Sequence, residues 1–444
     1  MKKNLPIIIV LLLFFIQEGN TQVVNYFSVP GYNEISKIDT NAYSVLPSGR
    51  YVKPAGQSIR ISHDPFGLAI SPNQKIAITM HENAITIIDL ASMQQKRIPE
   101  YKKNAFNPLK KGSFLGVAFN PNKNIVYLSG GDEGSVIIYD YVQNKKIDSI
   151  LLDGIFGGIK YEGSFTSDLI YEATRNELLI LDRGNFRLVR YSLNNKKIIA
   201  SIPTGRQPFG LAISPDQKTV LVANVGMYAY PIVEGTTKEN IQSQYINWHP
   251  YGNNTKESIE GKVIDGKKIP GLGSPNADES MSVFVIDLAT NKVKAKLKTG
   301  MLLGELVEDA EVIGGASPNS IVMGTKFAYV TNATNDNIAV IDYKKGRIVK
   351  HIPIKVDQRI DKLRGLVPFG IDLTKDEKYL FVALLGFNAV AKIDLASEKT
   401  LGLIPTGWGT TRVKLSNDDK TIYVTSCRGL GAGPNGGKNF KIPA

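Results

Sequence analysis

Four arginines of this 444-residue chain, Arg183, Arg206, Arg412 and Arg428, stand beside polar residues at similar places in a recurring pattern. Guanidinium groups bind carboxylate and phosphate oxygens through paired hydrogen bonds, so several arginines at one place would suit a small anionic ligand. The candidate ligand-binding residues are Arg206, Asn224, Asn332, Arg412, Arg428, Asp182 and Arg183. The alternative is a ring of salt links between neighbouring structural units, with Asp182 and other acids as the partners.

Two histidines suggest a second kind of chemistry. His63 is followed by Asp64 and His81 by Glu82, and a shared metal or an acid–base pair there is one interpretation. Solvated or capping histidines are the other, and we favour it. His249 and His351 lie on separate segments without the spacing of metal ligands.

Motifs for catalysis are missing from the sequence. It contains no nucleophile elbow, no zinc-protease motif and no heme-attachment cysteine pair, because Cys427 is its only cysteine. We predict no catalytic residue, no metal and no cofactor in this chain, and we leave open whether it belongs to an enzyme.

The elements that would position these residues are short strands that recur every 40 to 50 residues, the period of β-propeller blades. Pro65–Pro72, Phe114–Pro121, Pro208–Pro215 and Pro368–Leu373 resemble one another and predict innermost strands, whose glycines allow crowding around the axis. Seven β-branched second strands, from Ile76–Thr79 to Ile422–Thr425, predict an all-β, seven-bladed propeller of the YVTN or WD40 type with one long insertion.

A third strand ends in aspartate in five repeats, and each aspartate is expected to cap the following turn. These are Asp89, Asp140, Asp287, Asp342 and Asp394. The turn that enters an innermost strand and the turn that leaves a second strand must open on the same face. This topology places the candidate arginines, His63 and His81 around one mouth of the central channel.

The ends of the chain set the domain boundaries. A basic start and an apolar run to Ile16 predict a signal peptide at 1–21, with an uncleaved anchor as the alternative. A leader at 22–44 precedes a propeller at 45–444, with an insertion at 227–280 that either builds a binding surface or is a poorly ordered decoration. We expect Leu46–Gln57 to pair with the last strands in one shared, incomplete blade, unless the sequence is the front part of a longer protein.

The formal net charge of +12 comes mostly from lysines in hairpin turns, such as Lys145-Lys146 and Lys344-Lys345. Solvated turn lysines are enough to explain this net charge. Nucleic acid is not an expected partner, because no basic run is interleaved with aromatic residues. The expected location is the periplasm or the outside of a bacterial cell, with no membrane span after signal cleavage.

These repeats resemble the YVTN-repeat, YncE-like propellers, and more narrowly the propeller half of bacterial proteins that join such a propeller to a phosphoesterase of the alkaline phosphatase superfamily. The narrower resemblance covers nearly all of the mature chain and rests on four segments: Leu46–Ala55, Ile269–Asn276, Lys362–Gly370 and Arg428–Gly437. In that family the last segment leads to further strands and then to the metal-dependent phosphoesterase. Nothing follows Ala444 here, so phosphatase activity is not expected of this chain.

The resemblance implies a secreted binding or scaffold module, the half of a phosphoesterase system that binds a small anionic ligand or a protein partner. One alternative is a propeller hydrolase of the lactonase type that acts at the channel mouth. The other is a nucleic-acid-binding propeller.

Overall fold

The computed structural model describes residues 28–101, 105, 107–109, 115–237, 240, 255–307, 310–312 and 314–431. The predicted signal peptide, His249 with its aromatic neighbours Tyr245, Trp248 and Tyr251, and residues 432–437 of the glycine-rich segment lie outside this range. Within it, no helix is both long enough and apolar enough to cross a membrane.

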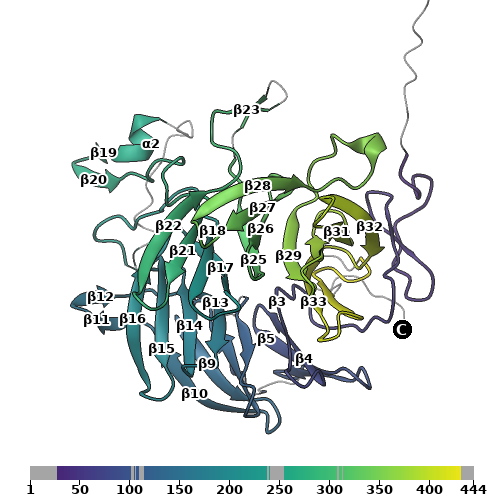
Figure 1. The fold of residues 1–444 in the computed structure, drawn as a ribbon, viewed down its shortest axis with the longest axis horizontal. Helices are drawn as coiled ribbons and strands as arrows, with labels where there is room; N and C mark the ends of the chain where they lie inside the picture. The colour runs from purple at the N-terminus through teal and green to yellow at the C-terminus, as the bar shows by residue number, and fades with distance from the viewer. Residues whose placement is uncertain are drawn as a thin grey trace, which may run out of the picture.

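Four-stranded antiparallel sheets radiate from a common axis (Figure 1). The first three comprise β3 (Gly67–Ile70), β4 (Ile76–His81), β5 (Ala84–Asp89) and β6 (Gln95–Ile98); β7 (Val117–Phe119), β8 (Ile125–Ser129), β9 (Ser135–Asp140) and β10 (Lys145–Leu151); and β13 (Thr166–Glu172), β14 (Glu177–Asp182), β15 (Arg187–Ser192) and β16 (Lys197–Pro203). The next three comprise β17 (Pro208–Ile213), β18 (Thr219–Asn224), β21 (Ser282–Asp287) and β22 (Lys292–Lys298); β25 (Pro318–Met323), β26 (Ala328–Asn332), β27 (Asn337–Asp342) and β28 (Arg347–Pro353); and β29 (Pro368–Leu373), β30 (Tyr379–Leu384), β31 (Ala389–Asp394) and β32 (Lys399–Pro405).

The all-β propeller is therefore confirmed, but the predicted number of blades is wrong: the described residues form six blades, not seven. The seventh repeat forms only a two-stranded sheet, β33 (Thr410–Leu415) with β34 (Ile422–Ser426). Counting second strands overestimated the blades because the described residues of this repeat contain a second strand but no outer strands to complete a blade.

The predicted pairing of the two chain ends is also wrong for the described residues. β1 (Ser44–Val45) pairs with β2 (Tyr51–Val52) in a sheet of their own. Ala55 N–H then donates to the carbonyl of Pro405, the last residue of β32, at 2.9 Å. The segment therefore contacts the sixth blade instead of completing the seventh sheet.

Hydrogen bonds between the innermost strands close the ring instead. Innermost strands contact one another in the order β3, β7, β13, β17, β25, β29, β33 and back to β3. At the closing contact, Thr411 Oγ1 donates to Pro65 O at 2.6 Å and Arg412 Nε donates to Phe66 O at 2.8 Å. Asp64 N–H adds a bond to Cys427 O at 3.1 Å. The two-stranded sheet thus fills the gap between the sixth and first blades.

Glycine is required in the innermost strands because neighbouring backbones approach closely. A Cβ atom on Gly67 would lie 2.6 Å from Leu115 O, and one on Gly210 would lie 2.1 Å from Asn319 O. In each case the clashing atom is a backbone oxygen in, or just before, the next innermost strand, and a backbone atom cannot rotate away. The steric expectation from the sequence is confirmed.

Hydrophobic clusters between adjacent blades form the core. One cluster joins Val340 and Ile352 of the fifth blade to Ile371 and Val382 of the sixth. The predicted aspartate caps are confirmed in all five turns: Asp89 Oδ1, for example, accepts Ser92 N–H at 2.8 Å, and its equivalents accept backbone N–H groups of their own turns.

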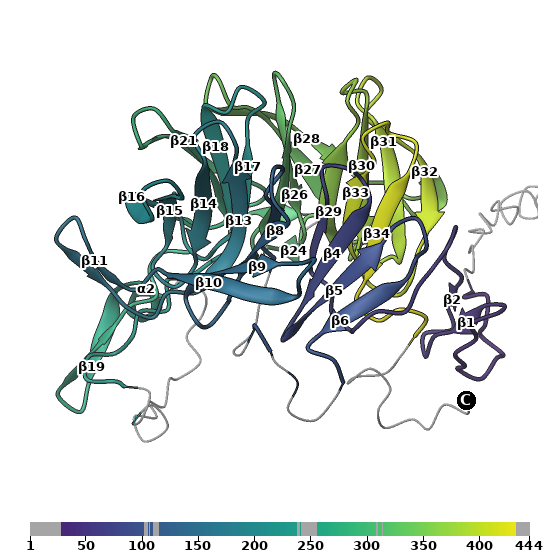
Figure 2. The same cartoon turned by 90° about the horizontal axis from the view of Figure 1, so that it is seen from below.

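The two faces of the propeller differ in their connections (Figure 2). One face carries only turns of four to six residues, such as 71–75 and 214–218, and we call it the tight-turn face. The opposite face, where innermost strands begin and second strands end, carries every long connection, including 152–165, 225–281, 299–317 and 354–367. We call this the long-loop face, and its centre is the channel mouth.

Short elements decorate the long-loop face. The connection 152–165 contains the hairpin β11 (Gly154–Phe156) and β12 (Ile159–Tyr161). The insertion contains α2 (Lys256–Glu260), β19 (Gly261–Ile264) and β20 (Lys267–Pro270). β23 (Leu306–Val307), β24 (Ala310–Glu311) and the 3-10 turn η1 (Gln358–Ile360) lie in the two connections that follow.

Candidate functional site

Four of the nine predicted site residues occupy one equivalent position, the last residue of the second strand in their blade. They are His81, Asp182, Asn224 and Asn332. The pairing registers place Asn224 opposite Pro208 and Asn332 opposite Pro318, where the innermost strands begin. Topology therefore brings them to the channel mouth as expected, but all four side chains are buried and hydrogen-bonded to neighbouring strands or connections.

Asp182 holds the third blade together rather than facing solvent. Its carboxylate accepts hydrogen bonds from Arg187 Nε at 2.8 Å and from Ser164 Oγ at 2.8 Å. The Arg187 guanidinium in turn lies 3.5 Å from the centroid of the Tyr161 ring. A buried carboxylate needs a charged partner, and Asp182 has one. Both residues belong to the third blade, so this is a salt link within a blade and not one between neighbouring blades.

The two asparagines bind their neighbouring strands. Asn224 Nδ2 donates to Ser282 O at 3.2 Å, while its Oδ1 is buried without a partner among the described residues. Asn332 Nδ2 donates to Asn337 Oδ1 at 2.8 Å and to Thr299 Oγ1 at 3.0 Å. Both amides therefore link the second strand to the third, and Asn332 also reaches the connection after β22.

His81 is buried in a network that fixes its tautomer. Nδ1 lies 3.0 Å from His63 O and must donate, because a carbonyl only accepts. Nε2 then accepts from the hydroxyls of Thr79 at 2.9 Å and Thr86 at 3.0 Å. Burial lowers the pKa of His81 to about 4, so the ring is neutral at ordinary pH.

His63 and Arg428 meet at Asp64 on the surface of the mouth. His63 Nδ1 lies 2.9 Å from Asp64 Oδ2, and Arg428 Nη2 lies 3.9 Å from Asp64 Oδ1. The His63 side chain does not contact the His81 side chain; only its carbonyl does. The two histidines are therefore adjacent, but not as a pair of facing imidazoles.

Arg206 anchors the insertion. Its Nη1 donates to Met227 O at 2.7 Å and to Ser274 O at 2.8 Å, which tie both ends of the insertion to the turn before β17. Burial lowers the pKa of Arg206. Arg183 Nε donates to Gln207 Oε1 at 2.6 Å in the same turn. These two arginines thus organise the loops of the mouth.

Arg412 differs from the other arginines because its guanidinium lies on the axis. Besides the bond to Phe66 O, its Nη1 donates to Ser320 Oγ on β25 at 2.9 Å. β29 separates β33 from β25 in the ring, so this contact spans the interior. On the mouth side, Phe369 packs against Phe66 and Phe209, with ring centroids 5.8 Å apart in both pairs. Three aromatic rings therefore fill the centre of the mouth.

Sequence reasoning missed Asp168, Ser320 and these three phenylalanines. A signal was available: Asp168, Ser320 and Arg412 replace the glycine that stands at the same place in the other four innermost strands.

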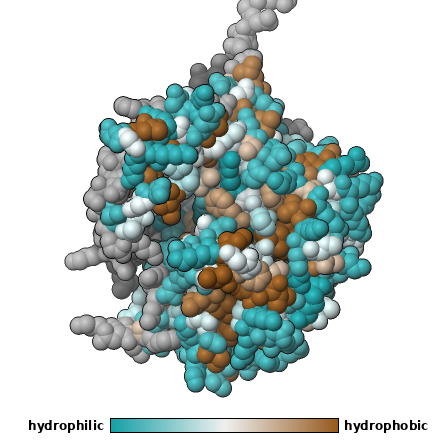
Figure 3. Space-filling model, turned by 90° about the vertical axis from the view of Figure 1, so that its left-hand side faces the viewer, coloured by the Kyte–Doolittle hydropathy of each residue, from teal (hydrophilic) through white to brown (hydrophobic). Residues whose placement is uncertain are grey.

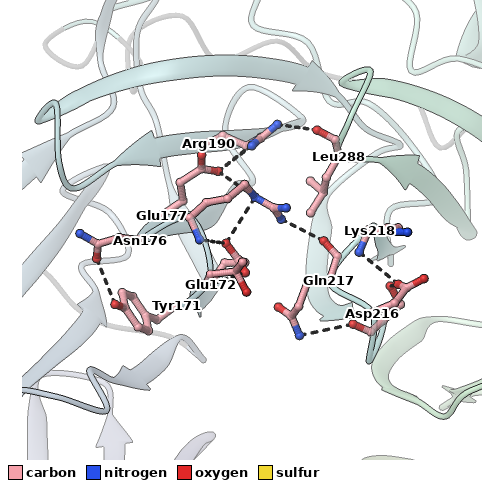
Figure 4. Close-up of polar contacts among 12 residues, drawn as sticks. Tyr171, Glu172, Asn176, Glu177, Arg190, Asp216, Gln217, Lys218 and Leu288 are labelled. Atoms are coloured by element: carbon pink, nitrogen blue, oxygen red, sulfur yellow. Dashed lines mark hydrogen bonds and ion pairs between the residues drawn. The ribbon is translucent and has the colours of Figure 1, made fainter.

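Charged side chains also link blades at the tight-turn end (Figure 4). Arg190 Nη2 lies 2.7 Å from Glu177, and its Nη1 donates to Leu288 O of the fourth blade at 2.7 Å. Arg175 Nη2 donates to Gln217 O at 2.9 Å. These two arginines thus link the third blade to the fourth through hydrogen bonds to backbone carbonyls, and the contacts lie far from the predicted mouth residues.

Apolar surface is exposed at the outer rim of the third blade. Ile155 is 78% exposed, and Figure 3 shows apolar patches among polar surface on this side of the molecule. A cavity of about 270 Å³ lies between the start of the β11–β12 hairpin and β16, lined by Leu152, Asp153, Gly154, Ile155, Phe156, Lys197 and Ile198.

In the part of the chain that the structure describes, no group of three or more histidine, cysteine, aspartate or glutamate residues could hold a metal ion.

No protein-family model matches the sequence, and no curated protein matches it either. Among solved structures, the propeller is similar to hydrazine synthase of Kuenenia stuttgartiensis, with a TM-score of 0.53 and 16% sequence identity. The match covers 84% of this chain and 95% of that chain. Identity at this level shows the shared fold alone, and the fold is a β-propeller.

Proposed function

We propose that this chain is a secreted binding or scaffold propeller that holds a protein partner on its long-loop face. The observation that carries the proposal is the position of the four segments on which the narrower resemblance rests, of which the last three are not generic blade sequence. Their described residues belong to the long-loop face: β1–β2, the end of the insertion, the connection before β29, and residues 428–431 after β34.

These segments are bonded to the propeller at defined places. Arg50 Nη1 donates to Gly386 O at 3.1 Å, and Gly365 N–H donates to Asp336 Oδ2 at 2.7 Å. Gly429 O accepts Trp408 N–H at 2.7 Å. Backbone held by such bonds is already ordered before a partner binds. Binding therefore costs little conformational entropy for these segments.

The described ends of the insertion, 227–237 and 255–280, are bonded in the same way. Apart from Arg206, Lys298 Nζ donates to Ser280 O at 2.7 Å and Pro275 O at 2.9 Å. Asn276 exchanges two hydrogen bonds with the backbone of Leu303, at 3.1 and 3.2 Å. For these described residues, the bonding favours a binding surface over a poorly ordered decoration.

The partner we propose is a phosphoesterase of the alkaline phosphatase superfamily, supplied by another segment or another chain. The support is the resemblance of the same four segments to propellers joined to such an enzyme. Exposed apolar side chains offer contact points on this face, including Ile232 (79% exposed) and Val263 (67%) on the insertion.

The test is co-elution and calorimetry with a purified phosphoesterase of that superfamily from the same genome. We expect Ile232→Asp with Val263→Asp to weaken the complex by at least about tenfold, because charged side chains would be buried against the partner. Val142→Asp is the matched control, since Val142 is 59% exposed in a turn of the tight-turn face. Equal loss in the control, or phosphoester or lactone turnover by the propeller alone, would contradict the proposal.

A further inference from the structure

A polar cavity lies on the tight-turn face, between the first and second blades. Its volume is about 190 Å³. Its walls come from the turn 71–75 between β3 and β4, from the turn 120–124 between β7 and β8, and from the residue that follows β9. We call it the turn cavity.

Asparagine dominates the lining of the turn cavity. Asn73, Asn120, Asn122 and Asn124 line it, and among the described residues that do so Lys123 is the only charged one. An asparagine amide carries two N–H donors and a carbonyl acceptor side by side, and a hydroxyl group both donates and accepts. The lining therefore suits a neutral molecule with several hydroxyl groups better than it suits an ion.

The same turn in other repeats shows that the amides are not needed for its shape. Its third residue is aspartate in three repeats, and each aspartate accepts the hydroxyl of the first residue and the backbone N–H of the fifth: Asp216, Asp376 and Asp418. Asn73 Oδ1 forms the same two bonds, with Ser71 Oγ at 2.7 Å and Lys75 N–H at 3.1 Å. One oxygen is therefore enough for the turn. Asparagine at positions 73 and 122 removes a negative charge and adds N–H donors in the two turns that line the cavity.

Several of these amide groups have no protein partner in the part of the chain that the structure describes. Asn120 is used by its own blade, because its Nδ2 donates to the Tyr127 hydroxyl at 3.2 Å and its Oδ1 accepts Asn122 N–H at 3.0 Å. By contrast, no bond between described residues uses Asn73 Nδ2 or the side chains of Asn122 and Asn124. These groups are therefore available to a ligand in the cavity.

An aromatic ring adds an apolar contact to the cavity. Tyr141 lines it and packs edge-on against Phe119, with ring centroids 5.2 Å apart and an angle of 85° between the ring planes. This contact holds the tyrosine ring in place. The C–H groups on one face of a sugar ring stack favourably on an aromatic face, because the π-electrons there carry partial negative charge. Amides beside an aromatic ring thus combine the two kinds of contact that a sugar makes.

We propose that the turn cavity binds a neutral pyranose sugar, with its hydroxyl groups on the amides of Asn73, Asn122 and Asn124 and its C–H face on Tyr141. Cavities that hold drug-sized ligands measure roughly 300–1,000 Å³, so this smaller cavity suits a single sugar ring. Lys123 is exposed, and solvent screens its charge, which gives an acidic sugar little advantage. The cavity lies on the face opposite the surface proposed for a protein partner, so the two proposals are independent.

Saturation-transfer NMR of the sugar in the presence of the full chain tests the site. The probes are D-glucose, D-galactose and D-mannose, with sorbitol as an open-chain polyol. We expect at least one of the three sugars to bind. Sorbitol should bind at least about tenfold more weakly, because its chain must lose conformational freedom that a closed ring has already lost.

Asn122→Ala with Asn124→Ala removes two amides without removing a bond between described residues. We expect this double variant to bind the sugar at least about tenfold more weakly, with unchanged thermal melting, because hydrogen bonds to the ligand are lost. Tyr141→Leu should weaken binding several-fold.

The matched control is Asn195→Ala, which changes an exposed asparagine in a tight turn outside the cavity and should leave sugar binding unchanged. The proposal is overturned if none of the three sugars binds or if sorbitol binds as well as they do. It is also overturned if the double variant binds the sugar like the wild type, or if Asn195→Ala loses as much affinity as the double variant.

Discussion

Polar side chains at the ends of the second strands show how chemically different residues can fill one position of a repeat. A histidine, an aspartate and two asparagines stand there, at His81, Asp182, Asn224 and Asn332. Each bonds to the third strand, the following turn or the turn before the innermost strand, because the backbone of a blade offers unpaired groups at this end. The same residue types that suggest chemistry in a sequence thus satisfy the architecture.

The buried His81 is expected to make the stability of the protein depend on pH. Its pKa is about 4 in the folded protein against an ordinary value of 6.5, so the unfolded chain binds a proton more readily between these values. Stability is therefore lost as the pH falls from about 6.5 to about 4, by on the order of 3 kcal/mol for this residue. We expect His81→Asn to show a smaller difference in unfolding free energy between pH 7.5 and pH 4.5.

Urea unfolding at the two pH values measures this effect, and comparison with the wild type cancels the contribution of the carboxylates. A wild type and a variant with the same pH dependence would show that His81 is not the titrating group.

At the scale of the strand, close approach of backbones around the axis determines which residues are tolerated. At four glycines, Gly67, Gly116, Gly210 and Gly370, the innermost strand approaches the backbone of the next blade without a side chain between them. The sequence pattern predicted this correctly, because a glycine that recurs once in each repeat has a geometric cause that repeats with it. Asp168, Ser320 and Arg412 replace this glycine in the other three innermost strands. The sequence could not explain them, because the role of each side chain depends on residues of other blades.

Gly210→Ala tests this crowding. The added Cβ would meet Asn319 O at 2.1 Å, and both strands must shift to relieve the clash. We expect a loss of at least about 2 kcal/mol in the free energy of unfolding, the cost of overpacking a rigid site.

The matched control is Gly402→Ala on β32, where no atom lies within 4 Å of the added Cβ. Thermal and urea unfolding should leave this variant within about 0.5 kcal/mol of the wild type. If the two variants are destabilised equally, crowding at the axis is not the cause.

At the scale of the whole molecule, the long connections lie on one face and several pairs of turn lysines lie on the other. Lysine pairs in the turns between third and fourth strands, such as Lys196-Lys197 and Lys344-Lys345, are exposed on the tight-turn face. The long connections lie on the other face. Solvated lysines on an exposed face attract polyanions only through long-range electrostatic forces. Dissolved salt screens these forces.

Binding to duplex DNA should therefore be weak and fall steeply with salt, with no measurable affinity at about 0.15 M ionic strength. Fluorescence anisotropy over a salt series measures it. Replacing both lysine pairs by glutamate should abolish the low-salt binding. Tight binding at physiological salt, or binding that survives the replacement, would instead favour the nucleic-acid alternative.

The repeats were sufficient to predict an all-β propeller, but not its blade count or its site. Strand period and turn chemistry act between near neighbours and leave a local signature. Arg206 meets Ser274 and Arg412 meets Ser320, across separations of 68 and 92 residues, and no local pattern encodes such pairs. The predicted site residues do share one face. Their role in binding a ligand stays a prediction.

The two-stranded sheet between the sixth and first blades also bears on how the ring moves. Every other second strand has partners on both of its edges, whereas β34 is paired on one edge only within the described residues. Opening of a closed ring needs the rupture of only one junction, and rupture begins where the fewest bonds must break together. The ring is therefore expected to open first at the hydrogen bonds of Thr411, Arg412 and Asp64. In hydrogen exchange, the amide protons of β34 should exchange with solvent earlier than those of the other second strands.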